Sequence, residues 1–124
     1  MSRVARVILF VKDLEPMVAF YRDVIGLAPQ GDATDGWQDF DAGGTAFALH
    51  AVPERYAKNI VIDDPPKPRE GAPTKVAFYA EDVKATREEL LAAGVQMGKL
   101  HEFDGMSFCN ATDPEGNVIQ FSNR

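Results

Sequence analysis

The two histidines of the chain, His50 and His101, are the side chains best suited to proton transfer near neutral pH. His50 belongs to an alternating stretch, residues 45–52, whose large apolar residues would face the other side of a strand. We therefore take His50 as the candidate for a chemical role, with a hydrogen-bonded wall residue as the alternative. His101 precedes Glu102, and adjacent strand residues face opposite ways, so we interpret this pair as an exposed loop.

An internal repeat places two basic residues at equivalent positions. Arg6-Val-Ile-Leu-Phe-Val-Lys-Asp13-Leu is echoed 69 residues later by Lys75-Val-Ala-Phe-Tyr-Ala-Glu-Asp82-Val. Each copy runs from a basic residue through apolar residues to an aspartate that precedes a helical pattern. A unit of about half the chain predicts two similar modules rather than a solenoid.

Arg6 and Lys75 should point toward the same region because they hold equivalent places in the two modules. There they would bind an anionic or carbonyl-rich ligand, the arginine in a bidentate manner and the lysine as a point charge. The alternative is that each pairs with a nearby acid, such as Asp39 or Glu102.

Aromatic residues at strand positions could stack on a planar or cationic ligand. Strand aromatics more often belong to a core, and Trp37, beside a glycine-rich loop, is the strongest candidate for a ligand contact. The candidates are Phe10, Trp37, Tyr79, Phe103 and Phe108.

The elements that position these residues follow from hydrophobic periodicity and from turn residues. In the first half we expect a strand at 4–11, a helix from Asp13 to Gly26 and a hairpin formed by 37–41 and 45–52. The second half repeats this order. Its expected elements are a strand at 75–80, a helix after Asp82, and strands at 95–100, 106–111 and 117–122, with a turn at Asp113-Pro-Glu-Gly116.

Residues 63–73 contain four prolines and read as a linker between the modules. A short strand is expected just before it, at 60–62. The sequence therefore predicts one domain, 1–124, of α+β class, built from modules at about 1–62 and 74–124.

Composition restricts the class of partner. The net charge of −6 argues against nucleic acid, and the N-terminal apolar run is too short for a signal peptide or membrane span. A single cysteine, Cys109, fits a reducing compartment, so we expect a cytoplasmic protein. Cys109 itself is interpreted as a packing residue.

Four segments together resemble the glyoxalase / bleomycin-resistance / extradiol-dioxygenase family, also called the vicinal oxygen chelate superfamily. The likeness covers nearly the whole chain and is carried by Val11-Lys-Asp13-Leu, Ala19-Phe-Tyr-Arg-Asp-Val-Ile-Gly-Leu27, Phe78-Tyr-Ala-Glu-Asp82-Val and Asp113-Pro-Glu-Gly-Asn-Val-Ile119. It implies two βαβββ modules whose mixed sheets curl around an open cavity, and in this family a single chain often forms a homodimer.

The resemblance also implies four metal-ligand positions, one on the first and one on the last strand of each module. In this chain they correspond to Arg6, Ala48, Lys75 and Gln120. Arginine and lysine are cationic and alanine has no donor atom, so we expect no metal and no other cofactor.

Two functions remain open. The first is a metal-free binding protein for a small molecule, with a homodimer as the expected assembly. The second is a lyase, isomerase or dioxygenase-type enzyme that acts on a carbonyl compound through His50 or a non-standard metal site. The expected ligand-binding residues are Arg6, Lys75, His50, Gln120, Trp37, Tyr79 and Phe10.

Overall fold

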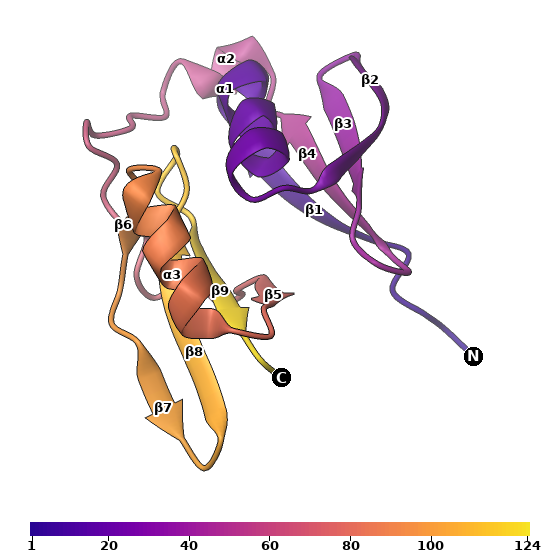
Figure 1. The fold of residues 1–124 in the computed structure, drawn as a ribbon. Helices are drawn as coiled ribbons and strands as arrows, with labels where there is room; N and C mark the ends of the chain where they lie inside the picture. Colours follow the sequence, from indigo (N-terminus) through magenta and orange to yellow (C-terminus); the bar gives the residue numbers. More distant parts are fainter. The chain divides into compact units, whose positions relative to one another are not determined.

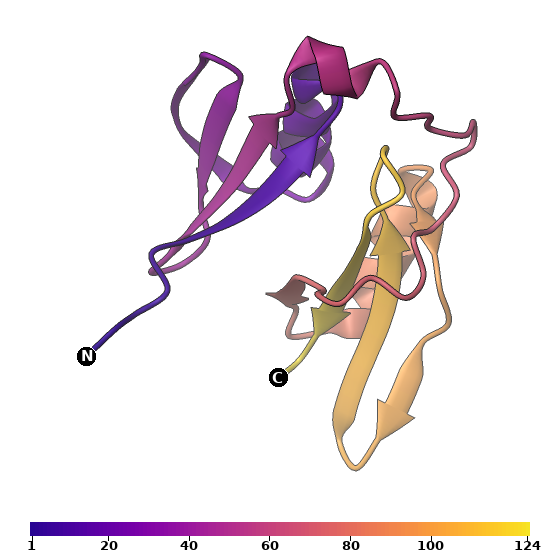
Figure 2. The same cartoon turned by 180° about the vertical axis from the view of Figure 1, so that it is seen from behind.

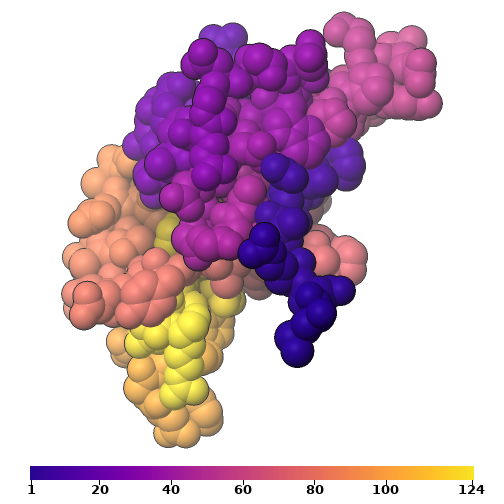
Figure 3. Space-filling view, turned by 90° about the vertical axis from the view of Figure 1, so that its right-hand side faces the viewer, coloured from indigo at the N-terminus to yellow at the C-terminus, as the bar shows by residue number.

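A computed structural model describes all residues, 1–124, and the chain divides into two compact units, Met1–Val61 and Ile62–Arg124. Each unit has its own mixed sheet with a helix across one face (Figure 1, Figure 2). Residues 1–5 precede the first strand and extend from the first unit as an exposed tail (Figure 3). The predicted α+β class is confirmed. The first unit has the predicted βαβββ order, whereas four strands follow the helix of the second unit.

The first unit contains a four-stranded sheet in the order β1-β4-β3-β2. The strands β1 and β4 are parallel, and the other pairs are antiparallel. Its elements are β1 (Arg6–Val11), α1 (Leu14–Ala19), the π-helical segment η1 (Phe20–Val24), β2 (Ala28–Thr34), β3 (Trp37–Asp41), β4 (Ala46–Ala51) and α2 (Glu54–Ala57).

The helix of the first unit changes from α to π geometry at Phe20, a change that the sequence pattern did not predict. The backbone N–H of Ile25 donates to the carbonyl of Phe20 over 3.0 Å, the i→i+5 bond of a π turn. This wider turn accompanies the burial of two consecutive aromatic rings, Phe20 and Tyr21. Gly26, with φ of +88°, then ends the helix as expected.

The core of the first unit lies between this helix and the sheet. Tyr21 contacts Phe47 with ring centroids 5.0 Å apart, and Met17 and Leu49 are fully buried beside them. Phe47 and Leu49 alternate along β4 with residues on the opposite face, as the sequence pattern predicted.

The second unit repeats this plan with a five-stranded sheet, ordered β5-β9-β8-β6, in which β7 also pairs with β8. The strands β5 and β9 are parallel. The side chain of Asp82 caps α3 by accepting from the backbone N–H of Ala85 over 3.0 Å. The elements are β5 (Ala77–Tyr79), α3 (Val83–Ala92), β6 (Gln96–Met97), β7 (His101–Phe103), β8 (Met106–Thr112) and β9 (Val118–Ser122).

The internal repeat extends to the register of the parallel strands. Ile8 pairs with Ala48 in the first unit, and Ala77 pairs with Gln120 in the second. Ile8 and Ala77 lie at the same distance before Asp13 and Asp82, so the two modules place equivalent residues side by side.

Three expectations for individual elements are corrected: one expected strand is absent, one is shortened, and one expected loop is a strand. Residues 60–62 form no strand; instead the carbonyl of Ile60 accepts from Lys12 Nζ over 2.6 Å, so a side chain takes the place of a sheet partner. Only Gln96–Met97 of the expected strand 95–100 forms a strand, paired with β8, and the pairing ends where the backbone N–H of Gly98 donates to the carbonyl of Asn110 over 2.8 Å. The residues His101 and Glu102, expected in a loop, pair with β8 as part of β7.

The turn between β8 and β9 is fixed by a buried carboxylate. Asp113, 1% exposed, accepts hydrogen bonds of 2.9 Å from the backbone N–H groups of Glu115 and Asn117. Gly116, between Glu115 and Asn117, accepts a hydrogen bond of 2.8 Å at its carbonyl from the backbone N–H of Arg69. This bond ties the linker to the turn. A side chain at Gly116 would collide with the carbonyl oxygen of Lys67.

No helix of the structure has the length and apolar character needed to cross a bilayer. The longest α-helix, α3, has 10 residues, whereas a helical span needs about 20.

We predict that Gly116→Ala lowers the free energy of unfolding by about 3 kcal/mol, because the left-handed backbone (φ +86°) disfavours alanine and the new Cβ meets the linker. Chemical denaturation measures this effect. Gly105→Ala is the matched control, since Gly105 has φ of +76° but open space around it, and should cost only about 1 kcal/mol. Equal losses in the two variants would contradict the proposed contact between linker and turn.

Candidate functional site

The face of the first sheet opposite α1 gathers four of the residues singled out in the sequence. Cross-strand partners lie on the same face of a sheet, and Phe10, His50 and Trp37 are partners across β1, β4 and β3. Arg6 lies on the same face of β1, because it is four positions before Phe10 and every second residue of a strand faces the same way. Strand pairing therefore brings together side chains that are far apart in the sequence.

Three aromatic rings form a cluster on this face. The His50 ring is 5.0 Å from the Trp37 ring and 5.7 Å from the Phe10 ring, measured between centroids, and both pairs are tilted. His50 and Trp37 are half-buried, whereas Phe10 is 61% exposed. A large aromatic side chain thus stays open to solvent beside two partly covered rings.

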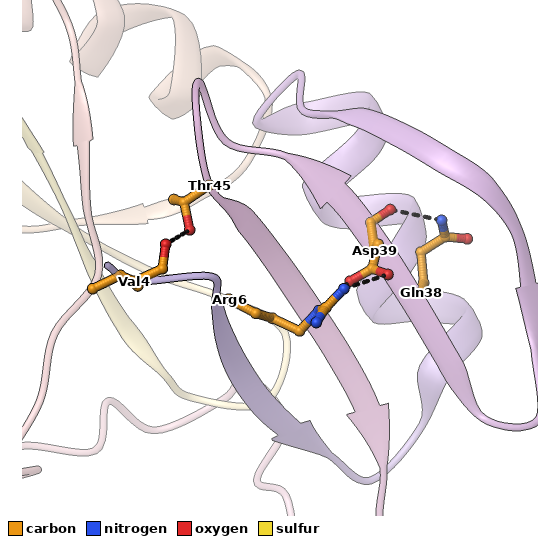
Figure 4. A network of polar contacts seen from close by, with 5 residues as sticks. All are labelled: Val4, Arg6, Gln38, Asp39 and Thr45. Atoms are coloured by element: carbon orange, nitrogen blue, oxygen red, sulfur yellow. Dashed lines mark hydrogen bonds and ion pairs between the residues drawn. The ribbon is translucent and has the colours of Figure 1, made fainter. Parts of the chain in front are cut away.

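An arginine–aspartate pair lies next to the aromatic cluster, in contact with the Trp37 ring. Figure 4 shows the two residues of this pair, Arg6 and Asp39. Arg6 Nε donates to Asp39 Oδ1 over 2.8 Å, and Arg6 Nη2 donates to Asp39 Oδ2 over 3.3 Å. The guanidinium carbon also lies 5.5 Å from the centroid of the Trp37 ring, within range of a cation–π contact. Arg6 is thus held by an acid, the alternative that the sequence had left open.

The ion pair changes the titration of Asp39. The hydrogen bond from Arg6 holds the pKa of the Asp39 carboxyl below its usual range, and a hydrogen bond from Trp37 acts in the same direction. Partial burial raises this pKa and so opposes both effects. Asp39 therefore stays ionised, and it neutralises Arg6 at any pH near neutrality.

The start of β1, and with it Arg6, is fixed by neighbouring side chains (Figure 4). Thr45 Oγ1 donates to the carbonyl of Val4 over 2.9 Å. On the other face of β3, Gln38 is buried, and its Nε2 donates to the carbonyl of Asp39 over 2.8 Å. These bonds limit the freedom of both partners of the ion pair.

The second sheet carries a separate polar group on its own face opposite the helix. Lys75 Nζ donates to Asn110 Oδ1 over 3.3 Å, and Gln120 Nε2 lies 3.5 Å from the same oxygen. The Lys75 ammonium makes no ion pair, neither with Glu102 nor with another acid. Tyr79, on the same face of β5, is 71% exposed.

Asn110 was missed in the sequence, although a signal was present. It lies in β8 between the buried residues Cys109 and Ala111, where alternation predicts one polar residue on the opposite face. His101 was assigned to a loop, but its ring stacks on Phe108 with centroids 4.8 Å apart and planes 14° apart. Asn110 and His101 share a face with Gln120, as the register of β7, β8 and β9 requires.

Cys109 is fully buried, and this burial raises the pKa of its thiol. A thiol that stays protonated is a poor nucleophile. The residue fills space in the core of the second unit.

The four positions at which the family resemblance implies metal ligands do not fit a divalent ion. Arg6 is already bound to Asp39, Lys75 is an ammonium, and Ala48 is buried and has no donor atom. Gln120 alone offers an oxygen, and the structure contains no cluster of three His, Cys, Asp or Glu side chains that could replace the set.

Asp39→Asn should lower the stability of the protein at neutral pH, because it removes the charge that Arg6 binds. Since the folded-state pKa of Asp39 is depressed, its stabilising contribution is complete above its unfolded pKa of about 4 and disappears as the pH falls through the folded value. Denaturation curves of wild type and variant should therefore differ at pH 7 and converge in acid. Asp41→Asn, on the same face of β3, is the matched control and should show little effect; a pH-independent Asp39→Asn difference would contradict the argument.

Comparison with known proteins agrees with this fold. A family model described as the Glyoxalase/Bleomycin resistance protein/Dioxygenase superfamily matches residues 3–121. No curated protein matches the chain.

Solved structures with the same fold include a lactoylglutathione lyase from Agrobacterium tumefaciens, at 26% identity and a TM-score of 0.69, which covers 98% of this chain and 93% of that one. Another is TnmS3, an antibiotic binding protein from Streptomyces sp. CB03234, at 21% identity and a TM-score of 0.74, with 98% and 94% covered. A glyoxalase/bleomycin resistance protein/dioxygenase from Nocardioides is 18% identical, with a TM-score of 0.72 and 98% and 83% covered. The chain belongs to the glyoxalase/bleomycin resistance protein/dioxygenase superfamily.

Proposed function

We propose that this protein binds a planar, largely apolar small molecule on the face of the first sheet opposite α1, and that it does so without a divalent metal. The observation that carries the proposal is the exposed Phe10 ring beside Trp37 and His50, next to the ion pair of Arg6 and Asp39. A mostly apolar surface with a few fixed polar groups is typical of small-molecule sites.

The aromatic cluster supplies the attractive surface. An exposed phenyl ring leaves apolar area in contact with water, and a flat ligand that covers it would remove that area. Ring-to-ring contacts add about 0.5–1.5 kcal/mol each beyond burial. Because Phe10, His50 and Trp37 come from three paired strands, the surface is formed before any ligand arrives.

The ion pair sets the charge that this face prefers. Asp39 neutralises the charge of Arg6, so this face does not attract an anionic ligand through an unpaired positive charge. Arginine carries five N–H donors, and the bonds to Asp39 use two of them. The remaining donors favour a ligand carbonyl. A hydrogen bond to that carbonyl would fix the orientation of a ligand that the aromatic rings hold by apolar contact.

The second sheet is proposed to contribute ligand contacts of its own through Lys75, Gln120 and Tyr79. Lys75 keeps its positive charge uncompensated, and Tyr79 exposes an aromatic ring. An anionic or carbonyl group suits this face better than a cation. The solved structure of TnmS3, an antibiotic binding protein, supports binding rather than catalysis as the role of this fold here.

Catalysis is the second candidate, and the likeness to a lactoylglutathione lyase favours it. His50 is the histidine of the aromatic cluster and would serve as the acid–base group. We prefer the binding function, because the residues at the family's metal positions in this chain cannot form a Lewis-acid centre. A non-standard metal site would reverse this preference.

We further propose that the chain acts as a homodimer in the cytoplasm. The strand β1 is at the edge of its sheet, with one side of its backbone unpaired and with Val7 and Ile8 exposed. Exposed apolar edge strands favour association with another chain.

Binding should be visible in the fluorescence of Trp37, which is the single tryptophan of the chain. We expect neutral 9-fluorenone, a planar tricyclic ketone, to quench Trp37 in a saturable manner, and Phe10→Ala to weaken its binding by about five- to tenfold through the loss of one ring contact. Tyr56→Ala is the matched control, since Tyr56 is similarly exposed but lies on α2. Equal binding by wild type and Phe10→Ala would rule out the proposed face.

Removal of divalent metal should change neither stability nor ligand binding. We expect the purified protein to contain less than stoichiometric divalent metal, and dialysis against EDTA to leave both the melting temperature and the fluorenone titration unchanged. The physical reason is that three of the four implied positions offer a metal no lone pair, since Arg6 and Lys75 are protonated and Ala48 has no donor atom. A tightly held, stoichiometric ion whose removal lowers stability would overturn the metal-free proposal and favour the enzyme.

A further inference from the structure

A pocket of about 550 Å³ lies within the first unit on the helix side of the sheet, between α1 and the edge strand β2. Its walls include Leu14, Val18 and Pro29, and its polar groups include Glu15, Asp32 and Gln38. Gln38 alternates along β3 with Trp37 and Asp39, so the pocket is on the opposite face of the sheet from the aromatic cluster.

An irregularity in β2 shapes this pocket. Gln30 pairs with Asp39 and Thr34 pairs with Trp37, so three residues of β2 stand opposite the single residue Gln38 of β3. Residues 31–33 therefore include two more residues than the partner strand, and this bulge bends the edge strand. Bulges of this kind are over-represented beside functional sites.

The side chain of Gln38 holds the bulge in place. Gln38 is 4% exposed, and its Nε2 donates to the carbonyl of Gly31 over 3.1 Å and to the carbonyl of Asp39 over 2.8 Å. Both amide hydrogens are thereby used, so the group has only acceptor capacity left, at its oxygen Oε1. Figure 4 shows this oxygen directed away from Asp39.

The charges around the pocket favour a cation. Glu15 and Asp32 are exposed acids that make no ion pair. The one basic group of the lining, Arg22, is bound in a bidentate manner by its neighbour Asp23, with N–O distances of 2.7 and 2.9 Å. The lining therefore offers two negative charges, an amide acceptor and apolar walls, without a free cation to oppose them.

We propose that this pocket is a second binding site for an organic amine with an apolar body. It is separate from the aromatic face, the face of the sheet that carries Phe10, Trp37 and His50. The ammonium group lies near Glu15 and Asp32, and the hydrocarbon part lies against Leu14, Val18 and Pro29. The volume falls within the range of about 300–1,000 Å³ that is typical of small-molecule sites.

The test compares two probes that share one hydrocarbon body, using isothermal titration of the full chain. We expect the cation 2-naphthylmethylammonium to bind, and the anion 2-naphthylacetate to bind about tenfold more weakly or not at all, because it meets two carboxylates. Amide NMR shifts should locate the cation at residues 14–22 and 29–34.

Variants separate the contributions of space and of charge. Ala33→Phe, at an exposed position of the lining, should fill the pocket and abolish binding without affecting the core. Glu15→Gln and Asp32→Asn should each weaken binding by about two- to fivefold, the effect of a partly exposed ion pair. Glu54→Gln is the matched control, because it removes one exposed acid of the same unit outside the pocket.

Phe10→Ala distinguishes this site from the aromatic face, since it should leave the affinity for the amine unchanged. Equal affinity for cation and anion, full binding by Ala33→Phe, or shifts confined to Phe10, Trp37 and His50 would each overturn the proposal. None of these results depends on whether fluorenone binds, so the two sites succeed or fail independently.

Discussion

The parallel pairing of the first and last strand within each module is the constraint on which the rest of the structure depends. Parallel neighbours cannot be joined by a tight turn, so a helix and the intervening strands must lie between β1 and β4, and between β5 and β9. The helix covers one face of each sheet, and alternation then leaves the other face for side chains that are not required by the core. Both modules use the same register, which places Ile8 beside Ala48 and Ala77 beside Gln120.

The two modules differ in how their equivalent basic residues are satisfied, and this difference determines the chemistry of each face. In the first module, Asp39 accepts two hydrogen bonds from Arg6, so charge is balanced and the aromatic rings dominate the surface. In the second module, Lys75 reaches only the neutral amide of Asn110. A cation without a carboxylate partner keeps its attraction for negative or carbonyl groups of a ligand. The same position in the repeat thus belongs to a face of balanced charge in the first module and to a positively charged face in the second.

Most of the fold was predictable because its signals are local. Asp82 caps its helix and Gly26 ends the other one, as their residue types indicate. The alternation of Phe47 and Leu49 correctly assigned the two faces of β4. The failures came where a long-range partner decides the outcome. Residues 60–62 have strand-forming side chains but pair with no strand, and the carbonyl of Ile60 accepts from the side chain of Lys12 instead. His101 and Glu102, in contrast, become a strand because β8 lies beside them.

The sequence by itself determined the two modules, the faces of the main strands and the residue types at the four positions where the family resemblance implies metal ligands, Arg6, Ala48, Lys75 and Gln120. These features depend on residue type and on spacing along the chain. Only the tertiary structure decided that Asp39 holds Arg6, that Asn110 holds Lys75, and that the bulge of β2 leaves a pocket beside Gln38. The physical reason is that a hydrogen bond or a cavity requires particular atoms to meet, and this meeting is set by strand register and by bulges, which periodicity does not encode.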